Sequence, residues 1–149
     1  MTSGSCVFCD IVRGTAQSSI VYEDSSVVAF MDIQPVNQGH VLVVPLVHAA
    51  HLADLDTETG AQLFRVGMVL SGAIRQSGVR CEGVNLFLAD GEAAGQEVFH
   101  VHLHVIPRFG GDGFGFRFPA SYHTLPERRE LDAVAADIRR ILEVERDAV

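Results

Sequence analysis

The sequence contains no lysine: all 11 basic residues are arginines, and they face 19 aspartates and glutamates, for a net charge of −8. A chain without lysine cannot form a Schiff base or hold a phosphate with the lysine of a Walker-type loop. The acidic balance also argues against binding a nucleic acid polymer, because such binding relies on basic residues that neutralise phosphates. A mononucleotide needs only a local pocket, which this charge balance permits.

Long hydrophobic runs are also absent, since the longest, such as 41–47, are far too short to cross a bilayer. The first five residues are small and polar and do not resemble a secretory signal, so we expect a cytoplasmic protein that binds no membrane. Cysteine is scarce: two of the three form Cys6-x-x-Cys9, which indicates a metal-binding or redox-active pair before a structural disulfide. We find no repeat or linker and expect a single domain over 1–149.

Hydrophobic patterning predicts five strands and two main helices. Short β-branched or alternating runs predict strands over 20–23, 27–31, 40–44, 84–89 and 98–106. Helical spacing predicts helices over 57–76, capped by Asp56 or Thr57, and over 127–145. The second helix carries a stripe that we expect to be buried: Leu131, Val134, Ile138, Ile141 and Leu142. This order of elements predicts an α+β fold, a largely antiparallel five-stranded sheet with one central and one C-terminal helix.

Three of the seven histidines lie within five residues, at 100, 102 and 104. On a strand they share one face, while Val101 and Leu103 face the core on the other side. One interpretation is a solvated polar face, but such a face is ordinarily built from threonine, glutamate or arginine. A cupin-type metal site needs a carboxylate soon after the histidines, and none follows within seven residues. Nucleophilic catalysis by a neutral imidazole is the third interpretation, and the one the pattern favours.

With this histidine pattern, the sequence resembles the histidine triad (HIT) family of nucleotide hydrolases and transferases, in particular the bacterial branch near the Hint proteins. The segment His100-Val101-His102-Leu103-His104-Val105-Ile106 matches the family signature, His-φ-His-φ-His-φ-φ. Further segments stand in family order and spacing: 6–12, 30–33, 39–45 and Gly95-Gln96. The resemblance therefore covers nearly the whole chain and implies a HIT-like fold.

The resemblance implies a role for each residue of the expected site. His102 would attack the α-phosphorus of a purine nucleotide and form a covalent nucleotidyl-histidine, which water then resolves. The other implied roles are phosphate or leaving-group contacts from His104, Gln96 and Asn85, ribose binding by Asp32, and a base pocket lined by Phe8, Ile11 and Ile33. Substrates would be phosphoramidates or (di)nucleoside polyphosphates, and the enzyme would be a homodimer. His40 would lie near the triad, either orienting it or as an ordinary structural histidine.

The two thiolates of Cys6 and Cys9 need two more ligands to bind tetrahedral zinc. The candidates are His48, His51, Cys81 and His100. The resemblance selects His48 and His100, which would make His100 a structural ligand that braces the strand carrying His102. The alternative is a metal-free thiol pair or a redox switch.

Glu97 departs from the family pattern, since many members carry serine or threonine directly after the glutamine. A carboxylate beside a phosphate is protonated, turned away or suited to another leaving group, such as an amine. The glycine-rich segment 110–115 lacks the residues of a phosphate loop and predicts a mobile loop near the site, with Arg108 on the surface. Two other functions stay open: a non-catalytic nucleotide-binding or scaffold module, and a zinc-dependent hydrolase.

Overall fold

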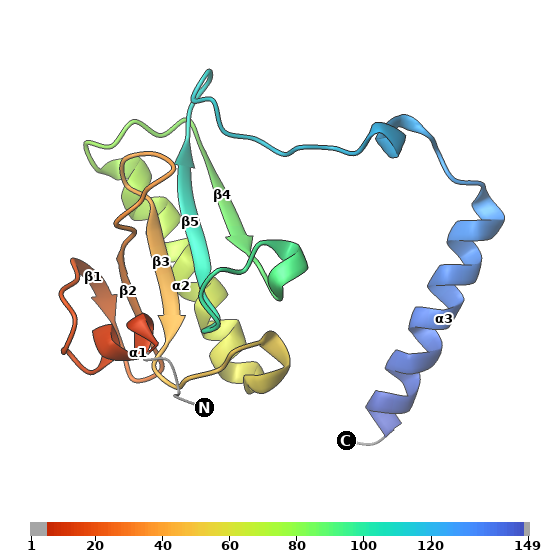
Figure 1. The fold of residues 1–149 in the computed structure, drawn as a ribbon, viewed down its shortest axis with the longest axis horizontal. Coiled ribbons are helices and arrows are strands. Elements are labelled where there is room, and N and C mark those ends of the chain that lie inside the picture. Colours follow the sequence, from red (N-terminus) through yellow and green to blue (C-terminus); the bar gives the residue numbers. More distant parts are fainter. Residues whose placement is uncertain (1–5, 148–149) are drawn as a thin grey trace. The chain divides into compact units, whose positions relative to one another are not determined.

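The computed structural model describes residues 6–147, which divide into two compact units, the first ending at Phe114 and the second beginning at Gly115. The first unit holds a five-stranded sheet, drawn from orange to cyan in Figure 1. Its strands are β1 (Ile20–Glu23), β2 (Val27–Met31), β3 (Val41–Pro45), β4 (Gly83–Leu88) and β5 (Leu103–Arg108). Their order is β1-β2-β3-β5-β4, and every neighbouring pair is antiparallel. The predicted α+β fold is confirmed.

The helix α2 (Thr57–Gln76) covers one face of this sheet and matches the predicted range. Asp56 is its N-cap and accepts a hydrogen bond from the Thr59 amide at 2.9 Å. Gly67 lets the helix approach the sheet closely, because a Cβ atom there would lie 2.9 Å from Leu103 Cδ2. The main core between helix and sheet contains Val27, Ala29, Val41, Val43, Leu63, Val66, Leu70, Val101, Leu103 and Val105.

A second apolar cluster lies apart from that core and is joined by the short helix α1 (Val7–Val12). Its buried members are Phe8, Val28, Phe30, Leu42 and Val44. In β2 and β3 these residues alternate with those of the main core, so they belong to the opposite face of the sheet. His100 and His102 of the triad lie on this second face, because the Phe8 ring contacts both of their rings.

The strand predicted over 98–106 begins only at Leu103 and runs on through Pro107 to Arg108. Before Leu103 the backbone leaves the ladder, and the Val101 amide donates to the carbonyl of Ala49 at 2.8 Å. Pro107 is tolerated because β3 pairs with β5 only from Leu103 to Val105, so the missing N–H breaks no bond to β3. The odd positions of the triad segment nonetheless face the core, as predicted.

Three single-turn 3-10 helices complete the elements: Leu52–Asp54 and Glu92–Ala94 in the first unit, and Ala120–His123 in the second. The second unit also contains α3 (Arg128–Asp147), close to the predicted range. The prediction that its apolar stripe is buried is wrong for the single chain, since Leu131, Val134, Ile138, Ile141 and Leu142 are between 42% and 59% exposed. Among the described residues of this unit, α3 has no strand or second α-helix to pack against. No helix within 6–147 is both long and apolar enough to cross a membrane.

Candidate functional site

A cavity of about 450 Å³ opens on the second face of the sheet. Its titratable lining residues are Asp32, His40, Glu97, His102 and His104. Apolar side chains, among them Phe8, Ile11, Phe30 and Leu42, supply most of the rest of the wall. A largely apolar hollow with a few converging polar groups is the usual form of a small-molecule site.

His102 lies directly before β5, and one of its ring nitrogens is fixed by a hydrogen bond. Its Nδ1 donates a hydrogen bond to the backbone carbonyl of His100 at 2.7 Å. Nε2 is therefore the free ring nitrogen and carries the lone pair. Burial lowers the pKa of His102, against the opposing effects of that hydrogen bond and of the Asp32 and Glu97 carboxylates. The imidazole is consequently neutral at pH 7, the form in which it can act as a nucleophile.

His40 and His104 form a hydrogen-bonded pair whose tautomers follow from one backbone amide. The amide of Val36 donates to His40 Nδ1 at 3.1 Å, so this nitrogen carries no proton. His40 Nε2 then carries the proton and donates it to His104 Nδ1 at 2.9 Å. The remaining nitrogen of His104, Nε2, must be a donor. Burial and the neighbouring His102 and His40 lower the pKa of His104 to about 4, which keeps this ring neutral.

His100 is buried and turns its own Nδ1 toward the two cysteines. Its Nε2 donates to the carbonyl of Pro45 at 2.9 Å, which leaves a lone pair on Nδ1. This nitrogen lies 3.4 Å from Cys6 Sγ and 3.6 Å from Cys9 Sγ. His48 Nδ1 lies 3.3 Å from Cys9 Sγ. The structure thus brings together the four predicted metal ligands, whose donor atoms all lie within 4.8 Å of one another.

These distances suit tetrahedral zinc. With Zn–S bonds of about 2.3 Å and Zn–N bonds of about 2.0 Å at the tetrahedral angle, a sulfur and a nitrogen ligand should be about 3.5 Å apart. The three sulfur–nitrogen separations given above lie within 0.3 Å of that value. Two thiolates and two imidazoles, one of them held by a backbone carbonyl, form a complete structural zinc set. The other two candidates, His51 and Cys81, do not belong to the cluster.

The residues predicted for the ribose and the base line the same cavity: Asp32, Ile33, Phe8 and Ile11. Asp32 accepts a hydrogen bond from the Gln34 amide at 2.8 Å through Oδ1, and its Oδ2 lies 3.5 Å from His40 Nδ1. Ile33 is 96% exposed, so it stands at the rim and not in the wall. The Phe8 ring lies 5.2 Å from that of His102, which places the expected base pocket directly beside the expected nucleophile.

Gln96 and Asn85 do not line the cavity. Gln96 is buried, and its amide nitrogen donates to the carbonyls of Ala50 and Val98, while its oxygen accepts from the Gly91 amide. These bonds hold the segment that leads to the triad. Asn85 accepts a hydrogen bond from Arg108. The phosphate contacts expected of Gln96 and Asn85 stay predictions.

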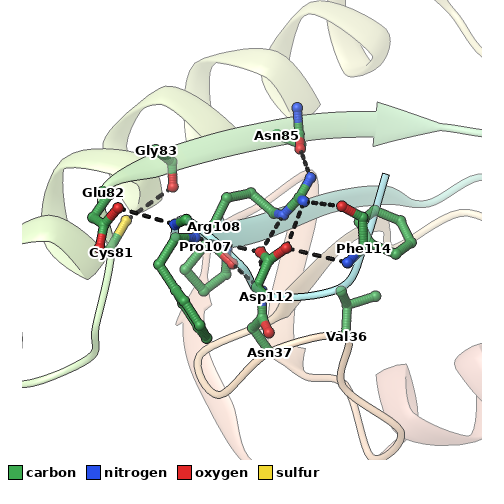
Figure 2. A network of polar contacts seen from close by, with 12 residues as sticks. Val36, Asn37, Cys81, Glu82, Gly83, Asn85, Pro107, Arg108, Asp112 and Phe114 are labelled. Carbon is green, nitrogen blue, oxygen red and sulfur yellow. Dashed lines mark hydrogen bonds and ion pairs between the residues drawn. The ribbon is translucent and has the colours of Figure 1, made fainter. Parts of the chain in front are cut away.

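Arg108 ties down the glycine-rich loop that follows β5 (Figure 2). Its Nε and Nη2 donate to the Asp112 carboxylate at 2.6 and 2.8 Å, and Nη2 also donates to the carbonyl of Phe114. Asn37 donates to Asp112 as well, at 2.8 Å. The Arg108 guanidinium holds the pKa of Asp112 well below its usual range. Arg108 therefore anchors a loop, where the sequence suggested a surface residue beside a mobile segment.

Three aromatic side chains of the cavity were not predicted from the sequence to line it: Phe30, Phe87 and Phe114. Phe87 on β4 lies opposite His104 in the strand register, with the two rings 5.6 Å apart. Phe114 reaches the cavity from the anchored loop. The pairing of β4 with β5 could have revealed Phe87, since residues directly opposite on paired strands share a face. The position of Phe114 depends on the Arg108–Asp112 ion pair, which no local sequence pattern predicts.

Comparison with known proteins agrees with this site. Residues 13–111 match the HIT domain family. "Protein hit" from Bacillus subtilis is 44% identical over 112 residues, which cover 74% of this chain and 77% of that protein.

Two solved structures are similar over most of their length. One is a zinc-bound histidine triad family protein from Mycobacterium smegmatis, with 41% identity, a TM-score of 0.72 and coverage of 92% of this chain and 97% of that one. The other is a histidine triad nucleotide-binding protein from Candida albicans, with 29% identity, a TM-score of 0.82 and coverage of 93% and 98%. From its fold, its triad and these matches, the chain belongs to the histidine triad family.

Proposed function

We propose that this protein is a nucleotide-binding hydrolase or transferase that acts on the α-phosphate of purine nucleotides. The substrates would be nucleotide phosphoramidates or (di)nucleoside polyphosphates. One observation carries the proposal: the free Nε2 of His102 and the donor Nε2 of His104 belong to adjacent rings, 4.8 Å apart, in one cavity. A neutral nucleophile beside a hydrogen-bond donor suits attack on a phosphorus centre whose oxygens gain charge.

In the first step, His102 Nε2 attacks the α-phosphorus and the bond from phosphorus to the leaving group breaks. The ring becomes a cationic nucleotidyl-imidazole, and its Nδ1–H stays bonded to the His100 carbonyl, which is well placed to stabilise the positive charge. In the second step, water attacks the phosphorus and returns the electron pair to Nε2. Hydrolysis then gives the nucleoside monophosphate and the free imidazole.

The neighbouring residues would bind and orient the nucleotide. His104 Nε2–H would donate to a phosphate oxygen, in the tautomer that His40 enforces. Asp32 would accept from the ribose hydroxyls, as a carboxylate suits a diol. Phe8 and Ile11 would line the base pocket. The Candida albicans relative is described as nucleotide-binding, which supports this assignment.

We also propose structural zinc at Cys6, Cys9, His48 and His100, supported by the zinc-bound Mycobacterium smegmatis relative and the fit described above. Zinc would tether α1 to the segment that carries His102, because His100 offers Nδ1 to the cluster and its carbonyl to His102. Four protein ligands leave no open position for an activated water. This argues against the zinc-dependent hydrolase.

The test of the proposed reaction is His102→Ala assayed with adenosine 5′-phosphoramidate and diadenosine tetraphosphate. We expect turnover to be lost while adenosine monophosphate still binds, because the base and ribose contacts remain. His123→Ala is the matched control, since this exposed histidine does not line the cavity. Wild-type protein that binds the nucleotide but turns over neither substrate would favour the binding or scaffold module.

We further propose that the protein is a cytoplasmic homodimer. Two exposed apolar surfaces support the dimer: the stripe of α3, and Phe64, Met68 and Val69 on α2, which are 53% to 68% exposed. Exposed apolar surfaces of this kind mark contacts between proteins. Sedimentation equilibrium at micromolar concentration should give twice the chain mass of 16.1 kDa. A single-chain mass would contradict the dimer.

A further inference from the structure

The turn that joins β2 to β3 supplies one backbone amide to the site. This amide, from Val36, donates to His40 Nδ1 at 3.1 Å, and the His40 amide donates to the carbonyl of Asn37 at 3.1 Å. In the described part of the chain, the hydrogen bonds that tie the turn to segments outside 32–40 come from the Asn37 side chain. The position of the Val36 amide therefore depends on what Asn37 contacts.

The Asn37 side chain uses both hydrogens of its amide group. It donates to the carbonyl of Pro107 at 2.9 Å and to Asp112 Oδ2 at 2.8 Å (Figure 2). The Asp112 side chain is 3% exposed, and its carboxylate also accepts from Arg108 Nε and Nη2 at 2.6 and 2.8 Å. A carboxylate held by two parallel bonds to a guanidinium has a fixed orientation, so it offers Asn37 a fixed acceptor.

His40 Nδ1 has two neighbours that favour opposite tautomers. The Val36 amide requires a lone pair on this nitrogen. Asp32 Oδ2, which lies 3.5 Å from the same nitrogen, favours a proton there, because an ionised carboxylate can only accept. The amide is the closer of the two, and its effect on Nδ1 lasts only while the turn holds Val36 in place.

The choice made at His40 Nδ1 reaches His104. With Nδ1 unprotonated, His40 Nε2 donates to His104 Nδ1 at 2.9 Å, and His104 keeps its own proton on Nε2. With Nδ1 protonated, the same bond reverses, so that His104 Nδ1 donates and His104 Nε2 carries a lone pair. Burial lowers the pKa of both histidines, so both rings are neutral in either arrangement and the reversal changes no net charge.

We infer that Asn37 and Asp112 are positioning residues that fix the direction of the hydrogen bond between His40 and His104. Acting through the Val36 amide, they hold His104 in the tautomer with a proton on Nε2. The consequence for catalysis rests on the proposed function, in which this Nε2–H donates to a phosphate oxygen. A lone pair in its place would face the phosphate oxygens and repel them.

The test is nitrogen NMR of the full chain, with isotope-labelled histidine and without substrate. The chemical shift separates a protonated ring nitrogen from one with a lone pair, and His104→Gln identifies the signals of His104. In wild type we expect the proton of His104 on Nε2. In Asn37→Ala, which loses both donated bonds, a second population with the proton on Nδ1 should appear.

Asp112→Asn is a second, independent variant, and it also serves if Asn37→Ala does not fold. Its amide group would place an NH2 against one of two donors, Arg108 or Asn37, so the support of the turn should weaken in the same way. We expect the same second population of His104 in this variant.

Glu82→Ala is the matched control. Glu82 accepts from the Gly110 amide at 3.0 Å and so holds the same glycine-rich loop, but within the described residues it makes no hydrogen bond to the turn. We expect His104 to keep its wild-type tautomer in this variant. A shift as large as that in Asn37→Ala would attribute the effect to a loosened loop and contradict the inference.

Activity separates this inference from the proposed function. If wild type turns over adenosine 5′-phosphoramidate, kcat should fall about fivefold or more in Asn37→Ala and stay at the wild-type value in Glu82→Ala. Folded Asn37→Ala and Asp112→Asn with the wild-type tautomer, or wild type with its proton on Nδ1, would overturn the inference and leave the proposed function standing. A tautomer shift in a protein whose wild type turns over no nucleotide would support the inference and remove the proposed function.

Discussion

His40 performs two separable tasks, and two amide variants should divide them. Its Nδ1 accepts the Val36 amide and its Nε2 donates to His104 Nδ1. Asparagine places an oxygen near the position of Nδ1, so His40→Asn keeps the acceptor and loses the donor. Glutamine places an amide nitrogen near the position of Nε2, so His40→Gln keeps the donor and loses the acceptor.

The magnitude follows from the burial of the pair. His40 is 2% exposed, and leaving a buried partner without its hydrogen bond costs about 1–3 kcal/mol. In His40→Asn, His104 is free to take the other tautomer, which turns a lone pair toward the phosphate. This corresponds to a loss in kcat of about 5- to 150-fold. In His40→Gln the cost falls on the Val36 amide instead, so the free energy of unfolding should drop by about 1–3 kcal/mol with kcat nearly retained.

The assay is kcat and KM for adenosine 5′-phosphoramidate at pH 7, together with urea unfolding of the three proteins. We expect His40→Asn to have the lower kcat of the two variants, and His40→Gln to have the lower free energy of unfolding. A His40→Asn variant with wild-type kcat would refute the tautomer assignment of His104. So would a His40→Gln variant that is as inactive as His40→Asn while folded.

Three further predictions concern stability and metal. Gly39→Ala should lower the free energy of unfolding by at least about 2 kcal/mol, because φ is +92° there and a Cβ atom would lie 2.8 Å from Val79 Cγ1. The control Gly60→Ala should not lower it, because a Cβ atom at that helical position meets open space. Equal urea midpoints for Gly39→Ala and wild type would contradict this prediction. His104, whose pKa falls to about 4 on folding, binds its proton more readily when unfolded, so wild type should lose up to about 3 kcal/mol between pH 6.5 and pH 4 that His104→Gln does not lose; parallel pH profiles would contradict it. Purified wild type should contain about one zinc per chain by elemental analysis. Cys9→Ser should contain little zinc, and Cys81→Ser should contain the wild-type amount. Wild-type protein without zinc would contradict the proposed metal site.

Much of the fold could be predicted because it follows from local patterns. The range of α2 comes from its apolar spacing and the Asp56 cap, and the first hairpin from the alternation around Asp24, whose Oδ1 accepts the Ser26 and Val27 amides at 2.7 and 2.9 Å. The start of β5 could not be predicted, because the bond from Val101 to Ala49 is a tertiary contact.

Some features of the site could likewise be predicted from the sequence, and others could not. The residue types and spacing of the triad and of Cys6-x-x-Cys9 can be recognised in the sequence alone. In the structure, His102 and His104 line the cavity, and Cys6 and Cys9 lie close to His48 and His100. The tautomer of His104 depends on the Val36 amide through His40, and the loop that presents Phe114 depends on an ion pair. Such features are set by three-dimensional neighbours and leave no periodic signal in the sequence.

The proposed mechanism requires that His102 becomes covalently nucleotidylated during turnover. The direct measurement is mass spectrometry of enzyme quenched at alkaline pH within the first turnover, followed by peptide mapping of the triad segment. We expect a nucleoside monophosphate on His102, formed as the leaving group is released and absent from His102→Ala. An adduct on His104 or His40, or undiminished turnover by His102→Ala, would contradict it.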